Sequence, residues 1–275
     1  MKHALLTGLV RALQRKPQGV LLLDTHAGRG AYDLARAATG DTLARQAEHP
    51  DGIGRLWREA ELPSPVADYV ELVRGFDRER AVPNPAAADG PQFYPGSPWL
   101  LHRLAREQDR IALCEMHPEE FEMLRGEFAR LRRMSVQHRD GYGALRAMLP
   151  PPERRALILI DPPYEAADEG ETAVAALAEG LRRFPSGVYA LWYPLAKRAR
   201  TAGFLGQLAA LPLPPTWVAE LTVDPLLPGM MGCGLAILNP PWQFVPSAEA
   251  WLPWLAQRLA QSPDARATSR WLVPE

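Results

Sequence analysis

The chain has 275 residues, 47% of them apolar and 23% charged, a composition that excludes a disordered chain and a small peptide-like module. Acidic and basic residues number 32 and 31, so the formal net charge is −1 and any binding to nucleic acid must rest on local charge. No run reaches the roughly 18 apolar residues of a membrane span, so no membrane association is expected.

The two cysteines, Cys114 and Cys233, both lie in apolar, strand-like runs. They are predicted to be small buried hydrophobic residues in a reducing compartment, which indicates a cytoplasmic protein without a disulfide framework. No metal site is predicted, because four of the histidines have no cysteine or acidic partner at metal-ligand spacing: His49, His102, His117 and His138.

Apolar runs bounded by turn residues alternate with helical patterns along the chain, which is typical of βαβ units around a mostly parallel sheet. The opening residues 1–17 have a helical pattern with too short an apolar core for a secretory signal. Seven strands are predicted, at 19–26, 110–117, 136–141, 156–164, 187–194, 217–223 and 232–241, with helices at 118–131, 171–184 and 195–211.

Two irregularities are expected in this alternation. The last two strands are joined by the short segment DPLLPGMMG, which has no room for a helical crossover and predicts an antiparallel hairpin. Residues 40–92 hold two helical patterns, around 52–61 and 66–78, followed by a Pro- and Ala-rich loop. We therefore expect one α/β domain over 1–275 that carries a helical insertion at 40–92.

Acidic residues stand where three of the predicted strands end. Asp24 precedes a turn, Thr25 to Gly30, whose glycines allow close backbone approach to a ligand, although a plain tight turn is an equal alternative. Glu115 can take both hydroxyls of a ribose, and Asp140-Gly141 stands beside a turn; each is also compatible with a solvated carboxylate at a strand end. Three acids at one sheet edge are more informative than any one.

The most specific signal is ILIDPPY, a buried strand followed by Asp161, Pro162, Pro163 and Tyr164. The prolines end the hydrogen-bonded ladder and fix a rigid loop. The Asp161 carboxylate and the Pro162 carbonyl can then accept the two N–H bonds of an adenine amino group and aim its lone pair at a methyl donor. Tyr164 offers a flat face for an extruded base. The alternative is an ordinary loop with an aromatic plug.

Other features favour structural roles. Trp251 and Trp254 have helical spacing and are predicted to belong to the core. Only three lysines stand against 28 arginines, a composition typical of a GC-rich genome, so arginine clusters are weak evidence for RNA contacts. We favour solvated helix faces for Arg125, Arg130, Arg132, Arg133, Arg154, Arg155, Arg182, Arg183, Lys197, Arg198 and Arg200.

Asp161-Pro162-Pro163-Tyr164 resembles the catalytic motif of amino-group methyltransferases that use S-adenosylmethionine. DTHAGRGAYDL, YPGSP, LCEMHP, RDGY, LILIDPPYE, ALWYP and NPPW together, in this order, resemble the RlmJ family of bacterial 23S ribosomal RNA adenine-N6 methyltransferases, from Lys2 to the terminal WLVPE. The resemblance implies a Rossmann-like class I methyltransferase, S-adenosylmethionine as cofactor, 23S rRNA as partner and a monomer.

By this resemblance the catalytic residues are Asp161, Pro162 and Tyr164, and cofactor contacts come from His3, His26, Ser97, Glu115, Asp140, Gly141 and Asp161. The physical roles agree: Glu115 suits the ribose hydroxyls, Asp140 the adenine amino group of the cofactor, and Asp24, His26 and Gly28 its methionine end. Two rival functions stay open, a DNA adenine-N6 methyltransferase and a catalytically silent RNA-binding protein of the same fold.

One departure from the family concerns the start of the chain. Family members carry a further segment, rich in Tyr, Arg, His and Gly, that precedes the Lys-His pair and folds over the active site, whereas this chain starts at Met1-Lys2-His3. The resemblance therefore implies a start codon assigned too late or a truncated chain. It also predicts that His3 lies at a frayed terminus.

Overall fold

The structure, a computed structural model, describes residues 1–38, 49–81, 90–131, 133–196 and 198–275. Along the chain the elements are α1 (Lys2–Leu13), β1 (Leu21–Asp24), β2 (Ala31–Asp33), α2 (Leu34–Ala38), α3 (Ile53–Leu56), α4 (Ser64–Arg80), β3 (Phe93–Pro95), α5 (Ser97–Leu104), β4 (Arg110–Glu115), α6 (Pro118–Phe128), β5 (Met134–His138), α7 (Gly141–Met148), β6 (Ala156–Ile160), α8 (Glu169–Arg183), β7 (Val188–Leu195), α9 (Arg198–Ala209), β8 (Thr216–Thr222), β9 (Gly232–Leu238), α10 (Phe244–Leu259) and β10 (Arg266–Val273).

One large sheet has the strand order β10-β8-β9-β7-β6-β1-β4-β5. The five strands β5, β4, β1, β6 and β7 pair in parallel, so their carboxyl ends lie along one edge. Strand β9 is antiparallel to both β7 and β8, which confirms the predicted hairpin at the end of a parallel sheet. The fold is the α/β architecture with a mostly parallel sheet that the sequence predicts.

The predicted number of seven strands was wrong, because β10 adds an eighth to this sheet by pairing antiparallel with β8. Half of the residues in its sequence RATSRWLV are polar, and over its first six residues exposed and partly buried positions alternate, so only one of its faces is shielded from solvent. Such an edge strand lacks the long apolar run that marks buried strands. A separate two-stranded sheet, β2 with β3, was also not predicted; each of its strands has only three residues.

Both faces of the large sheet are covered, because alternate strand residues enter two different hydrophobic cores. Leu22 in β1 packs into the core beneath α1, α4, α5, α6 and α10, whereas Leu21 and Leu23 face the core beneath α7, α8 and α9. Trp251 is buried in the first core and Trp254 packs against it, as predicted. Cys114 is buried and Cys233 half-buried, and both are free thiols.

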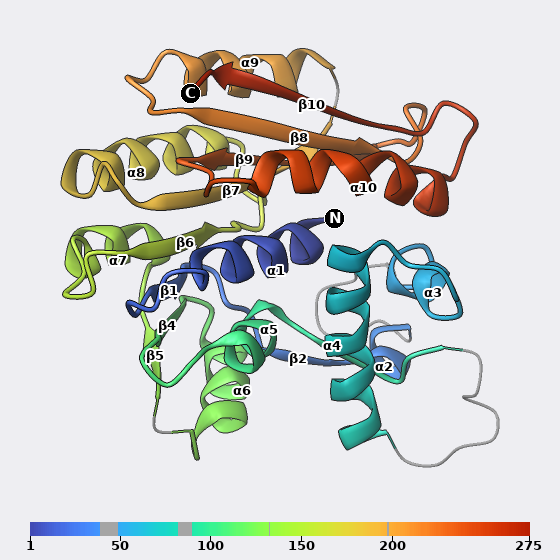
Figure 1. Cartoon of the computed structure of the whole chain (residues 1–275), viewed down its shortest axis with the longest axis horizontal. Coiled ribbons are helices and arrows are strands. Elements are labelled where there is room, and N and C mark those ends of the chain that lie inside the picture. Colours follow the sequence, from blue (N-terminus) through green and yellow to red (C-terminus); the bar gives the residue numbers. More distant parts are fainter. Residues whose placement is uncertain (39–48, 82–89, 132, 197) are drawn as a thin grey trace.

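Helix α1 lies between α4 and α10 (Figure 1) and confirms the helix predicted at the start of the chain. Its apolar face is fully buried. Two arginines from distant segments bind its carboxyl end: Arg155 donates to the Leu13 carbonyl at 2.6 Å, and Arg106 donates to the Gln14 carbonyl at 3.0 Å. These cations satisfy carbonyls that a helix end leaves without partners, so the carboxyl end of the helix is fixed.

The predicted insertion, 40–92, lies partly outside the described residues. Within it the structure has α3 and α4, and α4 packs against α1 and β3. The division into one domain with an insertion stays a prediction. No helix in the described part of the chain is long and apolar enough to cross a membrane.

Gly141 begins α7 where the backbone of the β1 turn comes very close, and this contact generates a prediction. A Cβ atom placed on Gly141 would lie 1.9 Å from the Thr25 carbonyl oxygen, so Gly141→Ala must displace one of the two segments. We expect it to lower the free energy of unfolding by about 3 kcal/mol. Chemical denaturation monitored by circular dichroism measures this change.

Gly126, inside α6, is the matched control. A Cβ atom there meets nothing within 4 Å. Gly126→Ala is expected to leave stability unchanged or raise it by about 0.5–1 kcal/mol, because alanine loses less conformational entropy in a helix. Equal destabilisation by both variants would contradict the close approach at Gly141.

Candidate functional site

The turn after β1 is the first part of the site. Gly28 and Gly30 have φ values of +58° and +83°, a left-handed conformation that glycine adopts without strain. The turn is tied to its neighbours: the Gly28 NH donates to Glu115 at 2.8 Å, and the Gly96 NH donates to the Gly30 carbonyl at 2.8 Å. The Arg29 guanidinium binds both oxygens of Glu120 in α6, at 3.0 and 2.6 Å. These contacts fix the backbone conformation of the turn at the carboxyl edge of the sheet.

Asp24, the last residue of β1, is a fully buried carboxyl group with an unsatisfied oxygen. Its Oδ1 accepts the His26 NH at 3.3 Å, whereas Oδ2 has no hydrogen-bond partner. The pKa of Asp24 is raised to about 7, mainly by burial and also by Asp161, against the opposing influence of Ser97 and Lys2. A buried polar atom without a partner is costly and indicates a place for a donor or a cation.

Glu115 and Asp140, at the ends of β4 and after β5, each hold backbone N–H groups. Glu115 accepts the His117 NH at 2.8 Å in addition to the Gly28 NH. Asp140 caps α7 by accepting the Tyr142 and Gly143 NH groups at 3.1 and 2.8 Å. Each carboxylate oxygen can accept a further hydrogen bond, so these residues have a structural role and keep capacity for a ligand.

His26 is half-buried and its ring is oriented by Thr25. The Thr25 hydroxyl donates to the Leu159 carbonyl at 3.0 Å, and its oxygen lies 2.8 Å from His26 Nδ1. Because that hydroxyl hydrogen is already used, Nδ1 is the donor to Thr25. Burial lowers the pKa of His26, although Asp161 and Glu115 oppose the fall. The neutral ring therefore keeps Nε2 as an acceptor.

Asp161 follows β6 directly, and its partner is one that the sequence did not predict. The Lys2 ammonium, at the start of α1, forms an ion pair with Asp161 Oδ2. Burial lowers the pKa of Lys2, but the charge and hydrogen bond of Asp161 outweigh it and the pKa is raised overall. Lys2 also lies 5.6 Å from the centre of the Trp192 ring. With so few lysines in an arginine-rich chain, the presence of a lysine here was itself a usable signal.

Tyr164 is held in an unusual conformation three residues further on. Its φ of +55° places a non-glycine residue in the left-handed region, where L-residues are strained by roughly 1–2 kcal/mol. Its hydroxyl donates to the Trp192 carbonyl at 2.8 Å, and the two rings meet edge to face at 5.7 Å. Strained backbone of this kind gathers at functional sites.

His3 does not lie at a frayed terminus, so that expectation was wrong. Helix α1 already begins at Lys2, and His3 Nδ1 lies 2.7 Å from the Tyr94 hydroxyl, with the two rings stacked. Tyr94 in turn contacts the Tyr69 hydroxyl of α4 at 2.8 Å. Burial, Lys2 and the chain's own amino group lower the pKa of His3 well below its ordinary value. Side-chain packing therefore fixes the start of the helix.

The predicted residues meet at one edge of the sheet, except that His3 lies in its own aromatic cluster beside it. The electrostatic influence of Asp161, Glu115 and Asp140 on His26 shows that these groups are near one another. Ser97, buried at the start of α5, adjoins Asp24. Gly141 completes the set by its contact with Thr25.

Several of the clustered arginines have partners within the chain. Arg155 does not lie on a solvated helix face, since it binds the Leu13 and Gln18 carbonyls at 2.6 and 2.8 Å. Arg132 and Lys197 lie outside the described residues. Salt bridges join Arg125 to Glu122, Arg133 to Glu107, and both Arg182 and Arg183 to Glu179.

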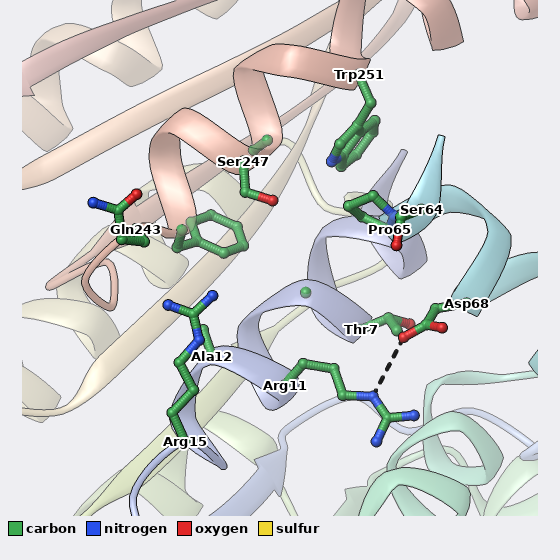
Figure 2. A pocket seen from close by; sticks show the side chains of 13 residues that line it. Thr7, Arg11, Ala12, Arg15, Ser64, Pro65, Asp68, Gln243, Ser247 and Trp251 are labelled. Carbon is green, nitrogen blue, oxygen red and sulfur yellow. Dashed lines mark ion pairs between the residues drawn. The ribbon is translucent and has the colours of Figure 1, made fainter. Parts of the chain in front are cut away.

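A separate pocket lies among α1, α4 and α10 (Figure 2). It contains Arg11, whose Nε lies 3.5 Å from Asp68 Oδ2, and Arg15. None of the carboxylates at the strand ends lines it. Its one carboxylate, Asp68, already has a cationic partner, so the pocket lacks the unsatisfied acceptors that mark the sheet edge.

Asp24 generates a prediction about stability and pH. The unfolded chain releases the Asp24 proton near 3.8 and the folded chain near 7, so between these values the folded state binds more protons and stability falls as pH rises. In Asp24→Asn this fall should be reduced, and at pH 8 the variant should melt on the order of 5 °C above the parent. Thermal unfolding of both proteins across pH 5–8 measures it. Parallel curves for the two would contradict the raised pKa.

Comparison with known proteins places these residues in a family. Residues 17–273 match the family described as Ribosomal RNA large subunit methyltransferase D, RlmJ. The chain is 37% identical over 277 residues to Ribosomal RNA large subunit methyltransferase J of Escherichia coli (strain K12), and 35% identical to the protein of that name from Haemophilus influenzae; each alignment covers 100% of this chain and 94% of the relative.

A solved structure has the same fold. The crystal structure of a Legionella pneumophila protein superposes with a TM-score of 0.83 at 33% identity, covering 98% of this chain and 94% of that one. Sequence and fold thus agree over nearly the whole chain, which belongs to the RlmJ family of ribosomal RNA large subunit methyltransferases.

Proposed function

We propose that this methyltransferase transfers the methyl group of S-adenosylmethionine to N6 of an adenine in 23S ribosomal RNA. Family membership supports methyl transfer and an rRNA substrate. The observation that carries the choice of an adenine amino group is the Asp161-Pro162-Pro163-Tyr164 segment directly after β6. This segment carries the Asp161 carboxylate, the Pro162 carbonyl and the Tyr164 ring at the edge of the sheet where the carboxylates of β1, β4 and β5 also lie.

The residues at the sheet edge fit S-adenosylmethionine, the methyl donor of this enzyme. The unsatisfied Asp24 oxygen suits the ammonium of its methionine part, and the glycine turn allows close approach. Glu115 suits the two ribose hydroxyls and Asp140 the adenine amino group, while His26 Nε2 and Ser97 add polar atoms. The cofactor supplies a methyl group on a positively charged sulfur with a neutral leaving group.

The chain's own residues then orient the target. Asp161 and the Pro162 carbonyl accept the two N6–H bonds, which turns the nitrogen lone pair out of the base plane and toward the methyl group. Lys2 stays an ammonium beside Asp161 and holds that carboxylate in place. Because the leaving group is neutral, no proton has to leave N6 before transfer, and the enzyme contributes mainly alignment and exclusion of water.

Mapping of the product tests this proposal. Protein-free rRNA from a strain that lacks the gene is treated with the protein and S-adenosylmethionine, digested and examined by mass spectrometry. N6-methyladenine at one position of 23S rRNA is expected. Methylation of duplex DNA at a higher rate, or of a base other than adenine, would overturn the proposal.

Replacing Asp161 tests the acceptor role. Asp161→Ala should lower the rate of methyl transfer by at least about 1,000-fold, since both the orientation of N6 and the partner of Lys2 are lost. The fold should be kept, because Asp161 lies at a strand end, although the melting temperature should fall by a few degrees because the largely buried Lys2 ammonium loses its partner. Asp168→Ala, which removes an exposed carboxylate from the same loop, is the control and should retain parental activity.

Two substitutions at Tyr164 separate the ring from the hydroxyl. Tyr164→Ala should lower kcat/KM about 10- to 100-fold by removing the face on which the base stacks. Tyr164→Phe keeps the ring and loses only the hydrogen bond to the Trp192 carbonyl, so a decrease below about fivefold is expected. Steady-state kinetics on rRNA measures both. Equal losses would assign the effect to the hydroxyl instead.

A further inference from the structure

A hydrogen bond between Tyr142 and Glu169 joins the first turns of two neighbouring helices, α7 and α8, which cover the same face of the sheet. Tyr142 is the second residue of α7 and Glu169 the first residue of α8. The phenol donates to Glu169 Oε1 at 2.6 Å, and both side chains are half-buried. Burial and the Glu169 carboxylate raise the pKa of Tyr142, so the phenol keeps the proton that it donates. A short bond to a carboxylate is among the stronger hydrogen bonds of a protein.

At one end of this hydrogen bond, Tyr142 contacts residues that are assigned to the cofactor. Its ring meets the His26 ring edge to face at 4.8 Å. Its backbone NH is one of the two that Asp140 caps. The position of the phenol therefore follows from the positions of His26 and Asp140.

At the other end of this hydrogen bond, Glu169 adjoins the residues that are assigned to the target base. Glu169 directly follows the segment 161–168. The next residue, Gly170, lies near Tyr164, since a Cβ atom placed on Gly170 would be 4.0 Å from Tyr164 Cε1. Backbone bonds from Glu169 to Ala166 and from Thr172 to Asp168 close the turn between them. The first turn of α8 thus supports one side of the Tyr164 ring, which the bond to Trp192 holds by its hydroxyl.

We propose that the Tyr142–Glu169 hydrogen bond positions the segment 161–168 and so contributes to setting the target side of the site relative to the cofactor side. Tyr142 is a positioning residue that acts through Glu169 and does not touch the reacting atoms. This inference rests on the proposed function, since it takes His26 and Asp140 as cofactor contacts and Asp161 and Tyr164 as target contacts.

A double-mutant cycle tests the contact. Tyr142→Phe keeps the ring against His26 and removes only the hydroxyl, and Glu169→Ala removes the acceptor. Each should lower kcat for transfer of labelled methyl groups to rRNA about tenfold, with the dissociation constant for S-adenosylmethionine within twofold of the parent. The double variant should be no slower than either single variant, because both remove the same bond.

Two further variants distinguish positioning from general damage. Glu169→Gln keeps a carbonyl that can accept from the phenol and should retain most of the parental kcat. Glu171→Gln removes the same charge from the same first turn of α8, where its contact is a 3.5 Å bond from Gln207, and should leave kcat unchanged. Additive losses in the cycle, or equal losses in Glu171→Gln, would overturn the proposal.

Hydrogen exchange gives a second readout that needs no substrate. In Tyr142→Phe, the amides of residues 164–172 should exchange faster than in the parent, while those of β6 stay unchanged. Unaltered exchange in 164–172 would overturn the proposal whatever the kinetics show. The label counts methyl groups wherever they are placed on the RNA, so a wrong target atom would contradict the proposed function and leave this comparison readable. Absence of transfer by the parent would leave hydrogen exchange to decide.

Discussion

The ion pair between Lys2 and Asp161 links the first helix to the centre of the site. Parallel strands bring their carboxyl ends to one edge, and here Asp24, Glu115, Asp140 and Asp161 follow four of them. Like charges so close together are unfavourable, and the sheet interior offers no water to screen them. Lys2 provides a compact cation at this edge. The position of the Lys2 ammonium depends on the docking of α1. It therefore depends on the buried leucines of α1 and on the arginines that bind the carboxyl end of the helix.

The other three carboxyl groups at this edge are accommodated in different ways. Burial and Asp161 raise the pKa of Asp24 to about 7 against the opposing influence of Ser97 and Lys2, so its carboxyl group is partly protonated near neutral pH. Glu115 and Asp140 instead accept two backbone N–H groups each, which fix the position of each carboxylate. Removing the Glu115 or Asp140 side chain would therefore remove an acceptor for the β1 turn or the cap of α7 in addition to a ligand contact. Substitution by glutamine or asparagine, which keep an acceptor, therefore separates ligand binding from local folding better than alanine does.

The sequence predicted those parts of the molecule whose signals are local. An apolar run that ends in Asp161-Pro162-Pro163-Tyr164 identifies a buried strand and its loop, and the short link between β8 and β9 required a hairpin. Lys2 was missed as the partner of Asp161, because the two residues are 159 positions apart in the sequence and their contact depends on how α1 docks. Strand β10 was missed because half of its residues are polar. The frayed start was wrongly predicted since the stacking of His3 on Tyr94 is likewise a tertiary contact.

The pairing of the arginines bears on how a nearly neutral chain could recognise RNA. Guanidinium groups that already bind carboxylates or helix carbonyls contribute less to attracting phosphates, because their charge is compensated and their donors are used. Arg29 on Glu120, Arg110 on Glu153 and Arg155 on the end of α1 are of this kind. Under the proposed function, general attraction to the RNA backbone is then weak, and discrimination falls to the shape of the site and to an extruded base that stacks on Tyr164. The rigidity of the segment 161–168 matters more in such an enzyme, since little of the binding energy comes from contacts that tolerate a displaced base.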